Sequence, residues 1–420
     1  MTRLLLFTND YPYATGDAVF VDKEIHELAS VFDDIAVFCY ARDTSVGLVD
    51  MPSNVFLADN LYGRTEDDRL IALLRPRALA DLAAAAWREC RAGRLLRHLR
   101  LFLQGAVVGI TGAQRRTVRE AIAADHDSVA YAFWGMGSGL VLPWLTNIGA
   151  RVVRLHRFDL YEESAEGGYL PFRRFLFHRA DRILAISDDG ADYLRRNYAG
   201  VIPPGKVQIS RLGVAGPAAV HRTAPQSPRL VVSCSAVSDV KRVGLLYEAL
   251  RSMPGLSADD PIRWIHFGDG PLFDDLAART ASAPAGLEVE LRGRVPNHEV
   301  IEFYAAHRVD AFVNVSVSEG VPVSIMEAIA HGIPIVATAV GGTPEIVSPG
   351  LGSGELVSAD GDAREIGAVL RTLLDAPEGT YDPRAVWRAH YDVRETGRIA
   401  AGLVRDVRDA GTSSSTRETP

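Results

Sequence analysis

The strongest constraint on the fold of this chain is a repeated order of short apolar runs, loops and helical segments. An apolar run at residues 4–8 is followed by a loop at 9–19, apolar residues at helical spacing between Phe20 and Phe32, and a second run at 35–40. The same order starts again at Arg229. Parallel strands joined by crossover helices produce such an order. We therefore predict an α/β fold of two tandem Rossmann-like, doubly wound domains that face each other across a cleft.

Length and composition agree with two domains. The chain has 420 residues, which is too long for a single ordinary hydrophobic core. Of these residues, 47% are hydrophobic. A segment with three prolines and no periodicity, AGPAAVHRTAPQSP, interrupts the α/β order and marks the predicted boundary. The predicted parts are a first domain at 1–214 with a helical insertion at about 65–124, a linker at 215–228, a second domain at 229–385, helices at 386–410 that pack back on the first domain, and a disordered tail at 411–420.

Charge and cysteine content exclude some classes of function. The net charge of −8 argues against a nucleic-acid partner. The three cysteines form no Cys-x-x-Cys pair, which indicates free thiols in a reducing compartment. The N-terminal apolar run is too short for a signal sequence, and no run is long enough to span a membrane. We expect a cytoplasmic location.

One segment of the insertion is rich in arginine. Leucine and phenylalanine side chains are interleaved there with arginines at every third position, namely Arg88, Arg91, Arg94, Arg97 and Arg100. Residues 88–102 then form either a basic amphipathic surface that contacts the inner face of an anionic membrane or a solvated helical face over a core. The second interpretation is favoured, and the first stays open.

The stretch SEGVPVSIMEAIAHG, residues 318–332, has the pattern of a binding loop that opens a helix. Pro322 is at a first helical position and Gly332 at a C-terminal cap, so the turn before Pro322 presents free backbone N–H groups. Glu319 lies in this turn, and Glu327 follows eight residues later on the helix. N–H donors suit a phosphate and carboxylates suit sugar hydroxyls, although an ordinary solvent-facing helix with an acidic first turn has the same pattern.

Residues 309–347 as a whole resemble the signature of retaining, GT-B-fold glycosyltransferases of family 4 (glycosyl transferases group 1), whose Glu-x7-Glu motif is matched by Glu319 and Glu327. The resemblance is weakest at 41–128. Four further motifs carry it, in order: RLHRFDLYEE at 154–163, ADRILAISDDGADYL at 180–194, VKRVGLLYEAL at 240–250 and HFGDGPL at 266–272.

The resemblance implies a nucleotide-sugar site in the second domain. Glu327 would bind the ribose hydroxyls, and Glu319 would lie beside the hydroxyls of the donor sugar as a catalytic-site residue. Lys241, also counted as catalytic, and Arg242 would neutralise the diphosphate, whereas Ala236 stands where the family often has arginine. The remaining donor-binding residues implied are the turn of Gly320, Val321, Pro322 and Val323, together with Gly268 and Arg294.

The first domain would be the acceptor side. His156 matches the histidine of a His-Gly-x-Asp loop near the donor sugar, with a catalytic or sugar-positioning role, although a lone histidine is more often structural. Arg157 replaces the glycine of that loop, and we interpret Asp159 as a helix cap. Gly16 matches the loop whose amides approach the diphosphate. The acceptor-side candidates are Asn9 and Asp17.

The function implied is a hexosyltransferase-type glycosyltransferase that retains anomeric configuration. It would move a sugar from a nucleotide diphosphate sugar to a hydroxyl of a glycan, lipid-linked or small-molecule acceptor, in exopolysaccharide or surface-glycan biosynthesis. No Asp-x-Asp motif joins a strand to a helix, so we expect no metal and no cofactor. Two alternatives stay open. One is a nucleotide-sugar epimerase or phosphorylase. The other is a catalytically silent nucleotide-sugar-binding subunit, which the alanine at Ala236 favours.

Overall fold

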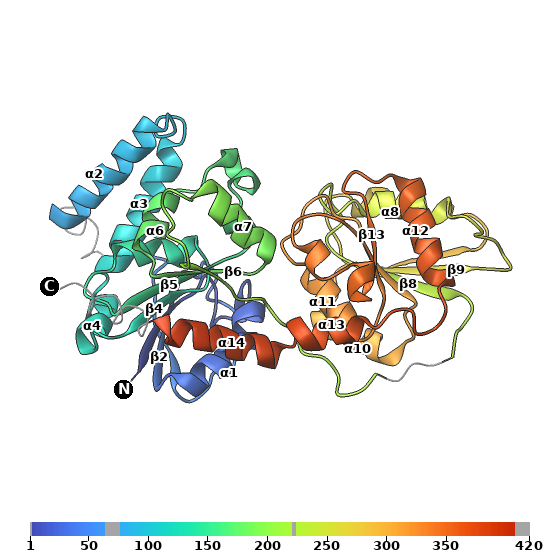
Figure 1. Ribbon diagram of the computed structural model, residues 1–420, viewed down its shortest axis with the longest axis horizontal. Coiled ribbons are helices and arrows are strands. Elements are labelled where there is room, and N and C mark those ends of the chain that lie inside the picture. The colour runs from blue at the N-terminus through green and yellow to red at the C-terminus, as the bar shows by residue number, and fades with distance from the viewer. Residues whose placement is uncertain (1, 64–75, 221–223, 408–420) are drawn as a thin grey trace. The chain divides into compact units, whose positions relative to one another are not determined.

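The computed structural model describes residues 2–63, 76–220 and 224–407 (Figure 1). The chain divides into two compact units. The first consists of Met1–Leu212 and Thr396–Pro420, and the second of Gly213–Glu395. Each unit contains one parallel sheet with helices, so the predicted α/β class with two doubly wound domains is confirmed. The predicted tail at 411–420 and residues 65–75 of the predicted insertion lie outside the described residues.

The first unit is built on a seven-stranded sheet with the order β3-β2-β1-β4-β5-β6-β7, in which all neighbours are parallel. The chain leaves β1 towards β2 and β3 and then returns to β4 on the other side of β1, which makes a topological switch point between β1 and β4. The strands are β1 (Arg3–Phe7), β2 (Asp34–Cys39), β3 (Val55–Asn60), β4 (Val129–Ala132), β5 (Ala150–Leu155), β6 (Arg182–Ala185) and β7 (Val207–Ile209).

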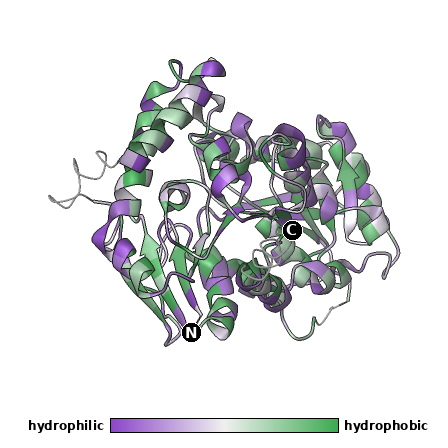
Figure 2. Cartoon of the chain, turned by 60° about the vertical axis from the view of Figure 1, so that its left-hand side comes forward, coloured by the Kyte–Doolittle hydropathy of each residue, from purple (hydrophilic) through white to green (hydrophobic). Residues whose placement is uncertain are grey.

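The two faces of this sheet are buried against different helices because successive strand residues point to opposite faces. Leu5 and Phe7 pack in a cluster with the insertion and with α6 (Arg173–Arg179) and α7 (Asp188–Asn197). Leu4 and Leu6 pack in a second cluster with α1 (Ala18–Val31) and α14 (Val393–Arg405). Helices therefore cover both faces of a sheet whose inner strands β1 and β4 consist mainly of apolar residues, which are coloured green in Figure 2. The helices of this unit are α1 (Ala18–Val31), α2 (Pro76–Arg91), α3 (Leu99–Gln114), α4 (Arg116–Ala124), α5 (Arg157–Leu160), α6 (Arg173–Arg179), α7 (Asp188–Asn197) and the end of α14 (Val393–Arg405).

The second unit repeats the plan with a six-stranded parallel sheet of order β10-β9-β8-β11-β12-β13. Its switch point lies between β8 and β11. The strands are β8 (Arg229–Cys234), β9 (Ile262–Phe267), β10 (Leu287–Leu291), β11 (Ala311–Asn314), β12 (Ile335–Thr338) and β13 (Gly354–Val357). The helices are α8 (Val243–Arg251), α9 (Phe273–Thr280), α10 (Asn297–Ala306), α11 (Val323–Ala330), α12 (Ala363–Asp375) and α13 (Pro383–His390).

The boundaries between the units differ from the predicted ones at both crossings. The segment from Gly213 belongs to the second unit, where the indole nitrogen of Trp387 on α13 donates to the carbonyl of Val214 at 3.0 Å. The chain returns to the first unit at Thr396 and not at residue 386, because α13 packs on the second unit. From there Ala401 and Val404 of α14 are buried in the same cluster as Leu4 and Leu6 of β1.

Three local predictions were incomplete. The loop after β12 contains a short 3-10 turn, Thr343–Glu345, which was not predicted. The edge strand β3 and the four-residue strand β13 were not predicted. Both strands lie at the edges of their sheets, and most residues of β3 are only partly buried. For this reason neither strand has the continuous apolar run of a central strand.

Candidate functional site

The switch point of the second sheet brings together the charged residues that follow β8 and β11. Lys241 Nζ lies 2.5 Å from Glu319 Oε1, and the carboxylate of Glu319 is nearly buried, with 9% of its side chain exposed against 28% for Lys241. Asn314, the last residue of β11, donates its amide to the same oxygen at 3.3 Å. A buried carboxylate therefore stands at this edge of the sheet with a cation and an amide beside it.

The turn before α11 is held from the loop after β12. Gly342 N donates to Gly320 O at 2.8 Å, and Gly341 has a φ of +51°. A Cβ atom on Gly341 would lie 2.0 Å from the carbonyl oxygen of Glu319, so only glycine permits this close approach. Val321 is buried. Gly341 and Gly342 lie within the motif at residues 309–347, but the contact between Gly341 and Glu319 was not predicted.

The helix after this turn starts one residue later than predicted. Pro322 has a ψ of 119° and is the N-cap of α11, whose first helical residue is Val323. Gly332 has a φ of +75°, in keeping with its predicted place at the C-terminal end. The turn of Glu319, Gly320 and Val321 thus precedes the N-terminus of α11, where backbone N–H groups lack partners within the helix.

Glu327 lies farther along α11 and is almost completely buried. Its Oε1 accepts a hydrogen bond from Asn297 Nδ2, at the start of α10, at 3.1 Å. Burial and then the charge of Glu327 raise the pKa of Cys234, the last residue of β8, to about 12. Glu327 therefore lies near the carboxyl end of the central strand, and Asn297 is a contact that the sequence did not indicate.

Arg242, predicted as a diphosphate ligand, is hydrogen-bonded to backbone carbonyls of two other segments. It adopts a φ of +49° at the N-cap of α8, and its Nε donates to Val315 O at 2.6 Å. Its Nη2 donates to Ala359 O at 3.1 Å. The guanidinium thus ties together the segments that follow β8, β11 and β13, while the neighbouring Lys241 is paired with Glu319.

The loops after β9 and β10 place the other predicted donor residues. Gly268 N donates to Gly293 O at 2.8 Å, which joins the two loops. Arg294 is 83% exposed and pairs with Asp269 at 3.2 Å. His266, near the end of β9, is fully buried, and its Nδ1 shares a hydrogen bond of 2.8 Å with Ser233 Oγ. Burial lowers the pKa of His266 to about 4.

The first unit gathers its candidates at the ends of β1, β4 and β5. Asp17 accepts hydrogen bonds from the backbone N–H groups of residues 9, 10 and 11 at 2.6–2.7 Å. The indole of Trp134 donates to Asp17 Oδ2 at 2.7 Å. Asp17 is buried, and these four donors give it the role of a clip that holds the β1–α1 loop. Asn9 Oδ1 accepts from Ser138 N at 3.2 Å and so joins the loop after β4 to the same group.

Gly16 lies in the β1–α1 loop beside the clip formed by Asp17. Its φ is +54°, and a Cβ atom there would lie 1.8 Å from Asp10 Oδ2. The loop therefore bends in a way that a side chain at position 16 would prevent. The approach of its amide to a diphosphate stays a prediction.

His156 follows β5 and lies against the same tryptophan. Its ring centroid is 3.8 Å from that of Trp134 and 5.4 Å from that of Phe133. Neither ring nitrogen has a hydrogen-bond partner among the described residues, and burial and then the charge of Arg154 lower the pKa of His156 well below its usual value. A neutral imidazole with unsatisfied nitrogens at the end of a central strand suits a hydroxyl ligand.

The structure agrees with the interpretation of Asp159 as a helix cap. Asp159 Oδ1 accepts from His156 N at 2.6 Å and Oδ2 from Gly135 N at 2.5 Å. These bonds link the loops after β4 and β5, so Asp159 fixes the backbone on which His156 stands. Trp134, which contacts both Asp17 and His156, was missed. Its only signal in the sequence is an aromatic residue at the end of a strand before Gly135.

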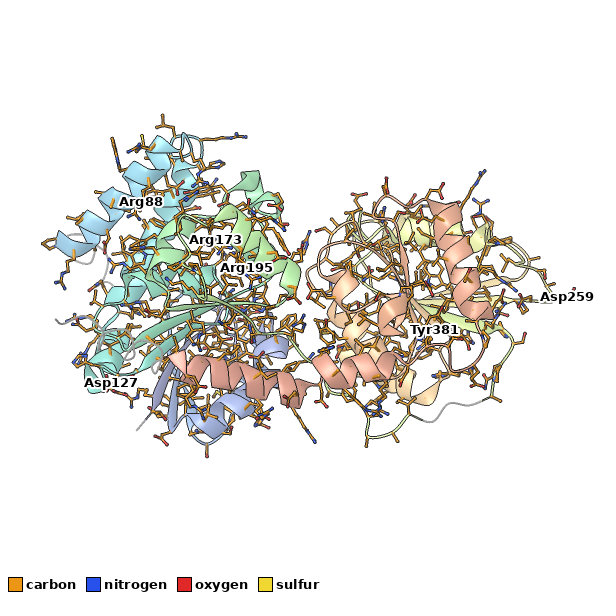
Figure 3. All side chains as sticks on the ribbon, in the orientation of Figure 1. Arg88, Asp127, Arg173, Arg195, Asp259 and Tyr381 are labelled. Atoms are coloured by element: carbon orange, nitrogen blue, oxygen red, sulfur yellow. The ribbon has the colours of Figure 1, made fainter. Side chains whose placement is uncertain are left out.

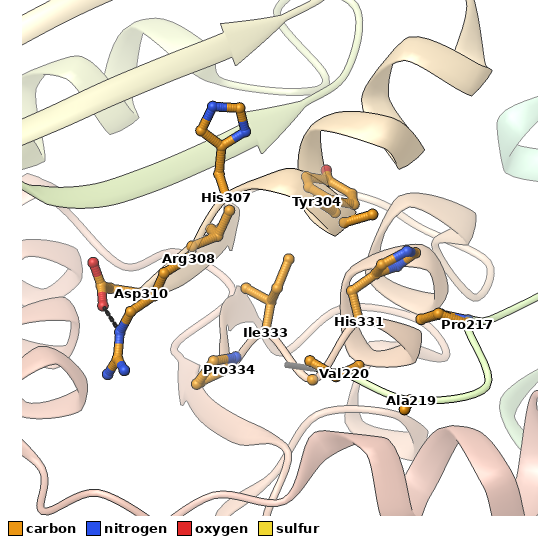
Figure 4. Close-up of a pocket in the computed structure, with 13 residues that line it drawn as sticks. Pro217, Ala219, Val220, Tyr304, His307, Arg308, Asp310, His331, Ile333 and Pro334 are labelled. Atoms are coloured by element: carbon orange, nitrogen blue, oxygen red, sulfur yellow. Dashed lines mark hydrogen bonds and ion pairs between the residues drawn. The ribbon is translucent and has the colours of Figure 1, made fainter. Parts of the chain in front are cut away.

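A small pocket of the second unit lies elsewhere (Figure 4). Tyr304, His331 and Pro334 line it, and so do Arg308 and Asp310, whose side chains form an ion pair at 3.0 Å. Because these last two residues immediately precede β11, the pocket lies at the amino end of the sheet, away from the edge where Glu319 follows β11. Within residues 2–63, 76–220 and 224–407, no group of three or more His, Cys, Asp or Glu side chains could hold a metal ion.

Two sequence relatives are named as glycosyltransferases. WcaL of Salmonella typhimurium, named for colanic acid biosynthesis, is 33% identical over 225 residues, which are 51% of this chain and 53% of that protein. TuaC of Bacillus subtilis, named for teichuronic acid biosynthesis, is 26% identical over 82% of both chains. The alignment thus spans about half of WcaL and most of TuaC.

Solved structures share the fold. A sucrose-phosphate synthase from Thermosynechococcus elongatus superimposes with a TM-score of 0.68 at 16% identity, over 97% of this chain and 100% of the other. HepE from Anabaena, solved in complex with UDP, gives a TM-score of 0.61 at 16% identity, over 97% and 100% of the two chains. At this level of identity the likeness shows the two-domain fold alone.

The family match falls on the unit that contains the ion pair of Lys241 and Glu319. The model of the family described as glycosyl transferases group 1 matches residues 220–388, which lie within the second unit. The second unit therefore contains the region that this family model describes.

Proposed function

We propose that this protein is a glycosyltransferase that moves a sugar from a nucleotide diphosphate sugar to a hydroxyl group of a glycan, lipid-linked or small-molecule acceptor. The observation that carries the proposal is the ion pair of Lys241 and Glu319 beside the N-terminus of α11, together with the buried Glu327 on that helix. The names of WcaL and TuaC support a role in building a surface polysaccharide. HepE, which shares the fold, was solved with UDP and with UDP-glucose.

Each charged group has one task in this proposal. Glu327 accepts hydrogen bonds from the ribose hydroxyls, which a carboxylate with two oxygens can hold as a pair. Glu319 accepts from hydroxyls of the donor sugar. Lys241 stabilises the negative charge that develops on the diphosphate as the bond to the sugar breaks. The N–H groups at the start of α11 contribute donors to the same anion.

Retention of anomeric configuration is part of the proposal. The bond between the anomeric carbon and the donor phosphate breaks, and the acceptor oxygen forms its bond on the same face of the sugar. The acceptor proton passes to the leaving phosphate oxygen, so the products are the glycoside and the nucleoside diphosphate. The neutral imidazole of His156 positions a sugar hydroxyl. No metal or cofactor is assigned a task, because Lys241 supplies the counter-charge.

A screen of nucleotide sugars tests the proposal. Release of nucleoside diphosphate is measured for the full chain with each donor, with and without acceptor glycans and lipid-linked saccharides, and with and without EDTA. Glu319→Gln should abolish release, whereas Glu288→Gln, an exposed glutamate on β10, should not. Nucleotide binding without release from any donor would refute transfer. Loss of release in EDTA would refute metal independence alone, and NMR of the product gives its anomeric configuration.

One alternative has an observation in its favour. A nucleotide-sugar-binding subunit without catalytic activity would agree with two features. Ala236 stands where the family often has arginine, and the guanidinium of Arg242 is hydrogen-bonded to backbone carbonyls. The same screen separates the two functions, since this subunit would bind nucleotide sugars and release nothing.

A further inference from the structure

We propose that the outer surface of α2 and α3 in the first unit docks on a bilayer of anionic phospholipids. This docking face consists of an apolar stripe flanked by arginines, and it lies on elements that the proposed transfer reaction does not use. The inference does not depend on that reaction, since binding to a membrane can be measured without it. The docking face contains Leu79, Trp87, Leu96, Leu99, Leu103 and Val107, with Arg77, Arg88, Arg91, Arg97 and Arg100.

The apolar side chains of the docking face are unusually exposed. Trp87 is 63% exposed, Leu96 86% and Leu103 51%. The opposite sides of the same helices are fully used, since Ala85 of α2 and Phe102 of α3 are buried in the core of the unit. The exposed stripe is thus a second apolar surface on helices that already have a core contact, which marks an interaction site.

The stripe follows helical spacing on both elements. Leu79, Ala83 and Trp87 stand four residues apart on α2, and all three are exposed. Leu99, Leu103 and Val107 have the same spacing and exposure on α3. Side chains four apart share one side of a helix, so each helix presents a continuous apolar line.

The structure changes the surface that the sequence indicated at 88–102. Helix α2 ends at Arg91 and α3 begins at Leu99, so the five regularly spaced arginines do not lie on one helix. Arg94 is occupied by Glu89, with Nε and Oε2 3.0 Å apart. The surface instead extends from Leu79 to Val107 and depends on two helices.

The charge of this region suits an anionic partner. Residues 76–107 contain six arginines and only two acidic residues, Asp81 and Glu89. Both acids are engaged, Asp81 with Arg179 at 3.0 Å and Glu89 with Arg94. Among the described residues, no ion pair of Arg88, Arg91, Arg97 or Arg100 is found, so their charges face outward. Figure 3 labels Arg88 on α2.

A basic hollow adjoins the apolar stripe at Trp87. It is lined by arginines of α2 and α6, by a histidine and by the exposed indole, with no carboxylate among its lining residues. A phosphate group fits such a hollow, because arginine binds phosphate oxygens bidentately, and an indole favours the interface between headgroups and acyl chains. The lining residues are Trp87, Arg88, Arg91, Ala92, Arg174, His178, Gly200 and Val201.

A bilayer surface explains both halves of the docking face. Apolar side chains enter the boundary between headgroups and acyl chains, while arginines remain at the anionic phosphates. A soluble phosphate compound would use the hollow but leave the leucines of α3 in water. None of the described helices is long and apolar enough to cross a membrane, so the contact proposed is with the surface.

Flotation of the full chain with lipid vesicles tests the proposal. The protein should float with vesicles of equal parts phosphatidylcholine and phosphatidylglycerol and not with pure phosphatidylcholine. Arg88→Gln with Arg91→Gln should weaken binding about 30-fold, given the contribution of each basic residue near an anionic surface. Leu96→Ser with Leu103→Ser should weaken it at low salt and at high salt alike, because apolar contacts are not screened. The matched control, Arg364→Gln with Arg388→Gln, changes two exposed arginines of the second unit and should float like the parent.

Three outcomes would overturn the proposal. One is no flotation with anionic vesicles, and another is equal flotation of the parent and of both double variants. The third is binding of glycerol phosphate in calorimetry by a protein that does not float with vesicles. That result would assign the basic hollow to a soluble phosphate compound. Circular dichroism of the variants checks that they are folded, and all substituted side chains are exposed.

Discussion

Lys241 Nζ lies 2.5 Å from Glu319 Oε1, so the cation that follows β8 and the carboxylate that follows β11 form one ion pair at the switch point of the second sheet. The pair joins two segments 78 residues apart in the chain. Each partner is positioned before a ligand arrives, and a donor diphosphate would meet a cation that is already held in place.

Loss of the cation should reduce transfer. Lys241→Gln leaves the buried carboxylate of Glu319 without its partner and the proposed diphosphate without its counter-charge. Since hydrogen bonds to charged groups are worth about 1.5–3 kcal/mol, we expect turnover to fall roughly 10- to 150-fold. Nucleoside diphosphate release is the measurement, with Arg364→Gln as a charge-matched control on the surface. Turnover equal to that of the parent would remove Lys241 from the mechanism.

Glu327→Gln should weaken binding of the nucleotide. The amide keeps the volume of the side chain but removes the charge that strengthens hydrogen bonds to ribose hydroxyls, so the dissociation constant should rise about tenfold or more. Calorimetry with a nucleoside diphosphate measures this. Asn297→Ala removes the neighbour that donates to Glu327 and should cause a smaller loss. If the affinity of Glu327→Gln matched that of the parent, the ribose would have to bind elsewhere.

Trp134→Phe should destabilise the first unit. The change removes the indole N–H that donates to Asp17 but retains an aromatic ring against His156. Loss of one hydrogen bond to a buried carboxylate should lower the free energy of unfolding by about 1.5–3 kcal/mol, measured with urea. Trp144→Phe is the matched control, because its buried indole nitrogen has no partner among the described residues. An equal loss in both variants would attribute the effect to ring size alone.

Gly341→Ala should disturb the mouth of α11. The added methyl group would lie 2.0 Å from Glu319 O, and the backbone has a φ of +51°. Gly205 has a φ of +83° with open space around it, so Gly205→Ala measures the backbone strain alone, about 1–2 kcal/mol. We expect a larger loss of stability in Gly341→Ala and a loss of donor binding that Gly205→Ala does not show. Equal effects on both properties would mean that the turn tolerates the contact.

His266 should make stability depend on pH. Burial lowers its pKa from 6.5 to about 4, so between these values the unfolded chain binds a proton that the folded chain does not. Stability therefore falls as the pH decreases through this window, by about 3 kcal/mol for this one group. His266→Gln, which retains an acceptor for Ser233, should reduce the difference in unfolding free energy between pH 7 and pH 4.5. An unchanged difference would contradict the prediction.

Much of the central architecture was predictable from local sequence. Apolar runs such as β1 and β4 are buried on both faces in a parallel sheet, and their composition indicates this directly. Glu319 and Glu327 could be found because the binding turn and the helix are continuous in sequence. The weakly patterned edge strands β3 and β13 could not, since partial burial leaves no continuous apolar run.

Contacts between distant segments were beyond the reach of pattern. Trp134 reaches Asp17 across 117 residues, and Arg242 binds the carbonyl of Val315 across 73. No local spacing encodes such pairs, because the order of strands in the sheet decides which loops become neighbours. The hydrogen bonds of Arg242 to backbone carbonyls were for this reason not predicted, and its contact with a diphosphate stays a prediction.

By itself, then, the sequence determined the α/β class, the two domains, the central strands and the turn that precedes α11. These depend on hydrophobic period and on turn residues, which act over a few positions. Only the tertiary structure decided that Lys241 pairs with Glu319, that Asp17 is a clip held by Trp134, and that α14 returns to the first unit. Those results follow from burial of charge and apolar area between segments far apart in the chain, which depends on topology.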